Sequence, residues 1–154
     1  MSVEETLAEM NLALPAPPKP VGAYVPWTRS GKVVFLAGQI PMRDGKAVVT
    51  GKLGRELTVE SCAEALEIAT LNALAAVKAA VGDLDKVKHI LKVTGYVASA
   101  EGFTDQAGVL NHASNLLIAI LGERGRHARL AIGVAELPLG VPVELEMILE
   151  VAPS

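Results

Sequence analysis

Residues 125–151 read GRHARLAIGVAELPLGVPVELEMILEV, which contains two alternating apolar patterns separated by a proline turn. Side chains along a strand point to alternate faces, so each pattern predicts a strand with one apolar face. Arg129 stands at the start of the first predicted strand. Because a guanidinium is always charged and carries a planar fork of donors, an arginine in this position is suited to binding a carboxylate.

The alternation also predicts where the charged residues of the two strands lie. If Leu130 and Ile132 cover the helices, Arg129 and Glu144 both point to the opposite, helix-free face of the sheet. A hairpin between the strands places Arg129 nearly opposite Glu150 and roughly 15 Å from Glu144, at ~3.3 Å per residue. We therefore expect that a neighbouring subunit supplies the second group if both residues contact one small ligand.

The composition indicates one domain with more apolar surface than a monomer of this size needs. The chain has 154 residues, of which 51% are hydrophobic, 20% are charged and only 3% are aromatic. No stretch approaches the roughly 20 apolar residues of a membrane span, so we expect no membrane partner. Since obligate interfaces resemble a core cut in half, the apolar surplus predicts a homo-oligomer.

Charge and motifs argue against several other classes of function. The net charge of −3 predicts no general attraction for nucleic acid. The single cysteine, Cys62, excludes an intrachain disulfide, and the three scattered histidines have no metal-ligand spacing. Neither a phosphate-binding loop nor a dinucleotide fingerprint is present, so we expect no cofactor and no metal. The N-terminus has no signal-peptide pattern, which favours a cytoplasmic protein.

The order of predicted elements indicates an α+β fold. Residues 1–20 form a short amphipathic helix followed by a proline-rich arm, and residues 21–154 form the main domain. Within the domain the patterns predict the order β-β-β-α-β-α-β-β, with strands at 22–29, 33–37, 47–49 and 89–99, helices at 58–81 and 104–120, and the two strands quoted above. This order predicts a mixed sheet with both helices on one face.

Three segments resemble motifs of the RidA/YjgF family of reactive imine deaminases. They are GAYV at 22–25, LAGQIP at 36–41, and the arginine strand at 128–129 followed by LP at 137–138 and VELE at 143–146. The resemblance implies a chorismate-mutase-like fold of the bacillus type. It also implies a homotrimer whose sheets line a central barrel, with ligand clefts between the subunits.

The same resemblance implies roles for individual residues. Arg129 would bind the substrate carboxylate, and Glu144 would hold or polarise the attacking water. Tyr24 would contribute a hydroxyl to the cleft and Gly38 a backbone amide, while Asn111 matches an asparagine near the family's cleft. The implied reaction is cofactor-independent hydrolysis of a reactive 2-imino or enamino acid, such as 2-aminoacrylate or 2-iminobutanoate, to a 2-keto acid and ammonia.

The chain departs from the best-studied deaminases at two positions beside this site. Ala37 stands where they have a serine, and Ala131 where they often have a cysteine. The departures keep open a second hypothesis, in which the same cleft binds a small carboxylate metabolite without turning it over. A third hypothesis is endoribonuclease-like activity, since Arg124, Arg126, His127 and Arg129 form a local basic cluster.

Each residue also has a purely structural alternative. Arg129 could form an interface ion pair with Glu150 or Glu146. Glu144 could be a strand carboxylate that is only solvated or lines the barrel, and Tyr24 could serve packing alone.

Overall fold

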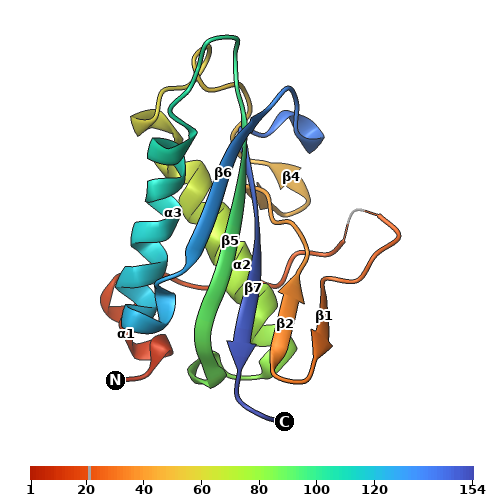
Figure 1. The fold of residues 1–154 in the computed structure, drawn as a ribbon, viewed down its shortest axis with the longest axis vertical. Helices are drawn as coiled ribbons and strands as arrows, with labels where there is room; N and C mark the ends of the chain where they lie inside the picture. Colours follow the sequence, from red (N-terminus) through yellow and green to blue (C-terminus); the bar gives the residue numbers. More distant parts are fainter. Residues whose placement is uncertain (21) are drawn as a thin grey trace.

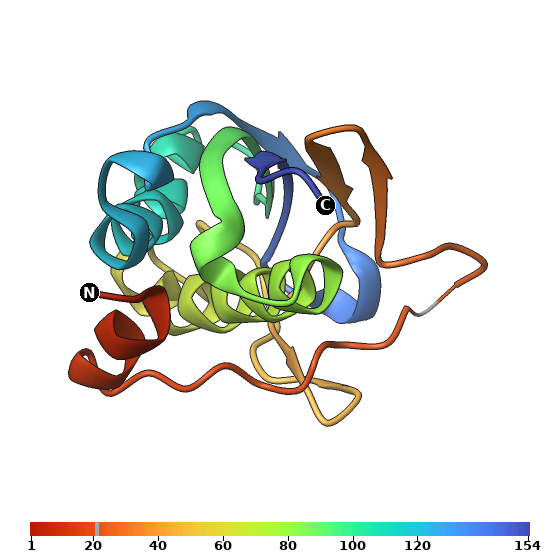
Figure 2. The ribbon, with the colours of Figure 1, turned by 90° about the horizontal axis from the view of Figure 1, so that it is seen from below.

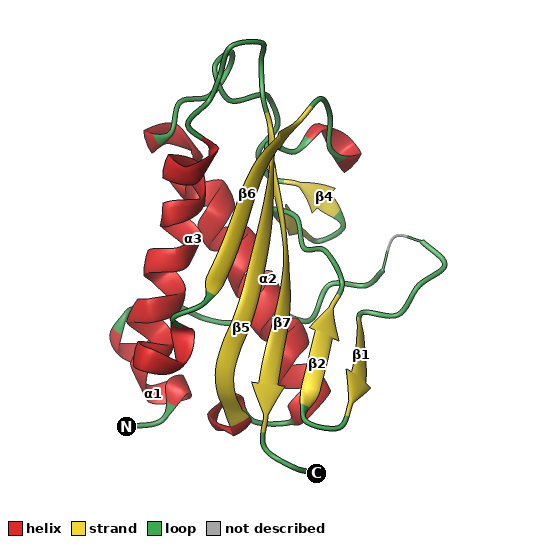
Figure 3. Cartoon of the chain, viewed as in Figure 1, coloured by secondary structure: helices red, strands yellow, loops and turns green. Residues whose placement is uncertain are grey.

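A mixed sheet with two long helices on one face forms the body of the protein (Figure 1). The computed structural model describes residues 1–20 and 22–154. The helices are α1 (Val3–Glu9), α2 (Ala63–Val81) and α3 (Gln106–Leu121), and the strands are β1 (Trp27–Ser30), β2 (Val33–Leu36), β3 (Met42–Arg43), β4 (Lys46–Ala47), β5 (Val87–Ala98), β6 (Ala128–Val134) and β7 (Val143–Val151). Figure 3 shows how loops join these elements. The predicted α+β class and mixed sheet are confirmed.

Two predicted boundaries differ from the structure near the N-terminal end of the sheet. The first strand begins only at Trp27, so Tyr24 precedes it in a loop. The third predicted strand, at 47–49, is replaced by a separate two-stranded hairpin of β3 and β4. Asp44 and Gly45 form its turn with φ angles of 53° and 76°, which are the left-handed values that such a short hairpin requires.

The last two strands do not form a hairpin, which corrects the predicted geometry. The strand order is β1-β2-β7-β5-β6, so β5 lies between β6 and β7. Strand β5 pairs in parallel with β6 and antiparallel with β7. A parallel pair needs a crossover connection, and α3 provides it between β5 and β6. Arg129 is therefore level with Val93, while Glu150 pairs with Val33 and His89.

The predicted facing of β7 is correct, whereas that of β6 is wrong. Alternate residues of β7 from Val143 to Val151 are buried against the helices. In β6, however, Leu130 and Ile132 point to the helix-free face and are 48% and 38% exposed. Arg129 faces α3 instead and donates hydrogen bonds to Asn111 and Ser114 of that helix.

The core lies between the sheet and the two long helices. Helix α2 is buried along most of its length and ends at Gly82, whose φ of 88° suits glycine at a helix C-terminus. Helix α1 joins the same core through Val3 and Leu7. Apolar residues along both long helices and the inner face of the sheet therefore form one continuous cluster.

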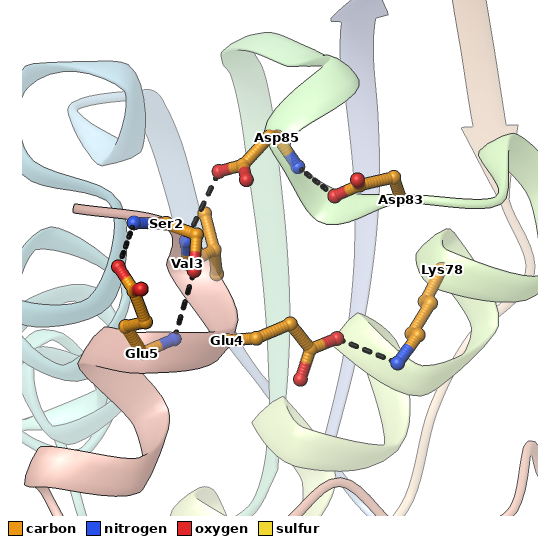
Figure 4. Close-up of polar contacts among 7 residues, drawn as sticks. All are labelled: Ser2, Val3, Glu4, Glu5, Lys78, Asp83 and Asp85. Carbon is orange, nitrogen blue, oxygen red and sulfur yellow. Dashed lines mark hydrogen bonds and ion pairs between the residues drawn. The ribbon is translucent and has the colours of Figure 1, made fainter.

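Polar contacts hold α1 against the body, as Figure 4 shows. The Lys78 ammonium lies 2.6 Å from a Glu4 carboxylate oxygen, and the backbone N–H of Val3 donates to Asp85 at 3.0 Å. Ser2 and Glu5 form a capping box at the start of the helix. From this anchored helix the proline-rich arm runs past α2 to the side of the molecule that holds β1 (Figure 2).

Candidate functional site

A cleft of about 530 Å³ opens beyond the end of β2 and contains several of the predicted site residues. Tyr24, Ala37, Gly38 and Glu144 all line it. Most of its remaining wall is apolar and includes Val25, Trp27, Phe35, Ile40 and Met42, with the arm residues Pro18, Lys19 and Pro20 closing one side. We call the four predicted residues in this cleft the Gly38 half-site.

The side chain of Glu144 lies against Gly38. Beyond the end of β2, Gln39 and Leu145 exchange two backbone hydrogen bonds of 2.7 and 3.0 Å. Gly38 and Glu144 are the preceding residues on the two paired segments, and a Cβ at Gly38 would overlap the Glu144 carboxylate. Any larger residue at position 38 would therefore displace the Glu144 carboxylate. Among the described residues, nothing accepts the N–H of Gly38, which leaves this donor available to a ligand.

The loop after Gly38 is held by a residue that the sequence did not single out for the site. Asn72 is buried in α2, and its amide donates to the carbonyl oxygens of Ile40 and Met42 at 3.0 and 2.9 Å. These two hydrogen bonds fix the floor of the cleft to the long helix. A polar side chain at a fully apolar stretch of a predicted helix is the signal that could have identified it.

The environment of Glu144 favours its protonated form. Burial raises the pKa of the Glu144 carboxyl, and the neighbouring Glu146 carboxylate raises it further. Glu146 accepts a 2.8 Å hydrogen bond from the hydroxyl of Tyr96, whose backbone pairs directly with Glu144. A carboxyl with a raised pKa is suited to taking up and releasing a proton, as a general acid or base must.

Arg129 lies in a second polar cluster, on the other face of the sheet. Its Nη1 donates to Asn111 Oδ1 at 2.8 Å and to Ser114 Oγ at 3.1 Å, and its Nη2 donates to the carbonyl of Ala107 at 3.3 Å. We call Asn111, Ser114 and Arg129 the Arg129 half-site. Ala131 lies on the same face of β6 and packs against the core.

The contacts of Arg129 leave one edge of its guanidinium available. The described residues accept three of its five N–H groups, so Nε–H and one N–H of Nη2 remain. Nε and Nη2 border one edge of the guanidinium, and on such an edge arginine can bind a carboxylate with two parallel hydrogen bonds. The structure shows no ion pair of Arg129 with Glu150 or Glu146 within the described chain.

The two half-sites do not meet within one chain. Arg129 is level with Met147 across β5, and Glu144 is three residues farther along β7. Two strand spacings of ~4.8 Å and three residues of ~3.3 Å put their Cα atoms about 14 Å apart, with the side chains on opposite faces. The predicted separation is confirmed, but its cause is the intervening strand and the opposite facing.

The described residues offer no support for a metal site, a cysteine nucleophile or a membrane-spanning helix. Across residues 1–20 and 22–154, no group of three or more His, Cys, Asp or Glu side chains is positioned to hold a metal ion. Burial raises the pKa of the Cys62 thiol to about 12, so this residue is no reactive nucleophile at neutral pH. No helix in these ranges has the length and apolarity needed to cross a membrane.

Comparison with known proteins identifies the fold and then the family. The fold matches that of Agrobacterium tumefaciens Atu1372, a protein of unknown function, with a TM-score of 0.89, 45% identity, and coverage of 97% of this chain and 92% of that one. A structure from Shewanella oneidensis, described as "a putative endoribonuclease", matches with a TM-score of 0.94 at 32% identity, covering 98% of this chain and 100% of that one. Protein TCP17 of Trypanosoma cruzi is 40% identical over 149 residues, which are 96% of this chain and 93% of that protein.

The family described as "YjgF/chorismate_mutase-like, putative endoribonuclease" matches residues 4–149. The chain therefore belongs to the YjgF family and has its chorismate-mutase-like fold. The family predicted from the three sequence motifs is confirmed.

Proposed function

We propose that this protein hydrolyses reactive 2-imino or enamino acids to 2-keto acids and ammonia, in clefts between the subunits of a cytoplasmic homotrimer. The observation that supports this most is the division of the site. One part of the chain offers an arginine edge for a carboxylate, and another offers a carboxyl group and a free amide. Because the two parts lie on opposite faces, a second copy is needed to bring them together.

The surface of the sheet supports assembly. Phe35, Leu130 and Ile132 are 45%, 48% and 38% exposed, and all lie on the helix-free face. Exposed aliphatic and aromatic side chains on one face favour packing against sister subunits. A head-to-tail contact, in which the Arg129 half-site of one copy meets the Gly38 half-site of the next, closes into a ring when the rotation fits.

Catalysis by such a site follows from the electrophilic character of the substrate. The free edge of Arg129 binds the substrate carboxylate and fixes the imine carbon in the cleft, which converts a bimolecular encounter into an oriented one. Glu144 takes a proton from water as the water oxygen bonds to the imine carbon. It returns this proton to nitrogen, which gives an adduct with one hydroxyl and one amino group on the same carbon. Glu144 then takes the hydroxyl proton and passes it to the amino group, so that the C=O bond forms as the C–N bond breaks and a 2-keto acid and ammonia leave. The N–H of Gly38 can donate to oxygen as the adduct forms.

Non-catalytic binding of a small carboxylate metabolite is the alternative supported by Ala37. This residue lines the cleft beside Gly38 but brings no hydroxyl to it. In that case the Arg129 edge and the cleft would hold the acid while Glu144 would transfer no proton. Retention of a 2-keto acid without ammonia release from an imine would decide for binding.

RNA cleavage is a further possibility only through the names of relatives. Arg124, Arg126 and His127 of the predicted basic cluster each contact a different partner in this structure. Arg124 donates to the carbonyl of Val87, and Arg126 pairs with Glu123 at 3.0 Å. His127 contacts Ser114, so the four residues do not form one open cationic surface.

The test is coupled turnover of 2-iminopropanoate and 2-iminobutanoate. An amino-acid oxidase generates each imine in situ, and its decay is followed with and without this protein. We expect faster conversion to the keto acid and faster ammonia release. An imine lifetime that does not change with protein concentration would reject deaminase activity, and the same samples incubated with RNA would reveal cleavage.

A further inference from the structure

His127 is linked to Arg129 through Ser114, and its hydrogen bonds define the tautomer of its ring. Its Nδ1 is 2.6 Å from the carbonyl oxygen of Gly125, and its Nε2 is 2.9 Å from Ser114 Oγ. A carbonyl oxygen can only accept, so Nδ1 carries a proton. Burial lowers the pKa of His127, which favours the neutral ring with an unprotonated Nε2.

This tautomer fixes the direction of the next hydrogen bond. An unprotonated Nε2 can only accept, so the Ser114 hydroxyl donates to it. The hydroxyl oxygen then turns its lone pairs away from the ring, and Nη1 of Arg129 donates to it at 3.1 Å. The result is a directed chain in which Arg129 donates to Ser114, Ser114 to His127, and His127 to the Gly125 carbonyl.

We propose that Ser114 and His127 are positioning residues that hold the Arg129 guanidinium with its Nε–Nη2 edge presented to a substrate carboxylate. This inference rests on the proposed role of Arg129. Asn111 and Ser114 accept from Nη1, while Ala107 accepts from Nη2. Both Nη1 hydrogens are thereby occupied, and the guanidinium cannot rotate about its long stem without losing several bonds. Neither Ser114 nor His127 contacts the edge that receives the ligand.

The hydrogen-bonded chain from Arg129 to Gly125 joins helix α3, strand β6 and the turn between them. Ser114 is one helical turn from Asn111 on α3, so both reach the same point on β6. His127 comes two residues before Arg129, just ahead of the strand, and Gly125 closes the preceding turn. Backbone crowding requires glycine at Gly125, because a Cβ there would collide with the backbone of α3 at Leu117. The carbonyl that orients His127 is thus fixed against the same helix that carries Ser114.

The first experiment compares Ser114→Ala, Ser114→Thr and Asn115→Ala in imine turnover. Asn115 is an exposed neighbour on α3 and serves as the matched control. For Ser114→Ala we expect KM to rise about tenfold with kcat within about twofold, the size expected from losing a hydrogen bond to a charged group. Ser114→Thr, which keeps the hydroxyl, should restore KM to near the wild-type value, and Asn115→Ala should change neither constant.

A second measurement does not depend on activity. Nitrogen-15 NMR of the histidine rings should show His127 with its proton on Nδ1, and Ser114→Ala should shift the Nε2 resonance of that ring alone. A wild-type His127 protonated on Nε2 instead would overturn the proposed chain.

Arg129→Ala separates the two proposals. If it abolishes turnover while Ser114→Ala keeps the wild-type KM, the positioning role is refuted and the deaminase proposal stands. If Arg129→Ala leaves turnover unchanged, the deaminase proposal fails at its carboxylate-binding step.

Discussion

The Gly38 half-site lies in a cleft with largely apolar walls, whereas the Arg129 half-site lies between β6 and α3 and is held by hydrogen bonds. The first depends on a close approach, since Gly38 leaves room for the Glu144 carboxylate. The second depends on directed donors and acceptors that hold a charged group in one orientation. The Gly38 half-site therefore provides a carboxyl group in a cleft that is lined by no arginine, and the Arg129 half-site provides an oriented guanidinium outside that cleft.

The largest expected effect comes from removing the oriented charge. Arg129→Ala should lower kcat/KM for 2-iminobutanoate by about 100-fold or more, because the carboxylate loses its charge-assisted, bidentate partner. Arg126→Ala is the control, since that exposed guanidinium pairs with Glu123 outside either half-site. Steady-state kinetics on both variants checks the prediction, and equal losses would show that local positive charge alone matters.

Mixed subunits test whether the two halves come from different chains. Glu144→Gln should inactivate the protein nearly as strongly as Arg129→Ala, because an amide cannot accept and return the proton. In assemblies formed from equal amounts of both variants, about one quarter of the contacts between neighbours combine an intact arginine with an intact glutamate. Co-expression of tagged variants should therefore recover roughly a quarter of wild-type activity. Recovery near zero would place both groups of a working site in one chain.

A smaller effect is expected from filling the space beside Glu144. Gly38→Ala adds a Cβ where the carboxylate lies, so the glutamate must move. We expect kcat to fall about tenfold while unfolding free energy falls by only ~1–2 kcal/mol, as for other overpacked sites. Activity and chemical denaturation measured on the same preparation distinguish this from general unfolding, in which both would collapse together.

The smallest expected effect is on how the free energy of unfolding depends on pH through Glu144. The folded-state pKa of Glu144 is raised, so the folded protein binds this proton more tightly than the unfolded chain does. Its contribution to stability is full below the ordinary pKa of 4.5 and is lost as pH rises through the higher folded value. Relative to Glu144→Gln, the wild-type protein should lose unfolding free energy over that interval. Denaturation curves from pH 4 to 8 measure this difference, and parallel curves would contradict the raised pKa.

The sequence predicted correctly which face of the sheet Glu144 occupies, but not which face Arg129 occupies. Gly38 and Glu144 lie beside the isolated bridge between Gln39 and Leu145, which follows the β2–β7 pairing after a change of register by one residue. Arg129 was assigned to the wrong face because the larger aliphatic side of a strand was assumed to cover the helices. On this edge strand the face toward α3 carries Arg129, Ala131 and Gly133, and Leu130 and Ile132 occupy the other face.

Ser114 and Asn72 illustrate that contacts between residues far apart in the chain are not predicted from a single sequence. Each makes its contact with a segment far along the chain, Ser114 with β6 and Asn72 with the loop after Gly38. The distance between such partners depends on strand order, and the intervening position of β5 could not be read from alternation alone. The pairing of Asn111 with Ser114 one turn apart is the pattern that would have indicated a polar seam on α3.

Strand β5 sets the offset between the two half-sites, because it pairs with β6 on one side and with β7 on the other. Its register against β7 shifts between Val87 and His89 and again between Ile90 and Lys92, before the rows that contain Arg129 and Glu144. In a closed ring every subunit repeats the same offset, so a one-residue error in β5 would be reproduced at each contact. The regular pairing of β5 with both neighbours from Val93 to Val97, after the last register shift, therefore fixes the spacing of the two half-sites in every copy of the chain.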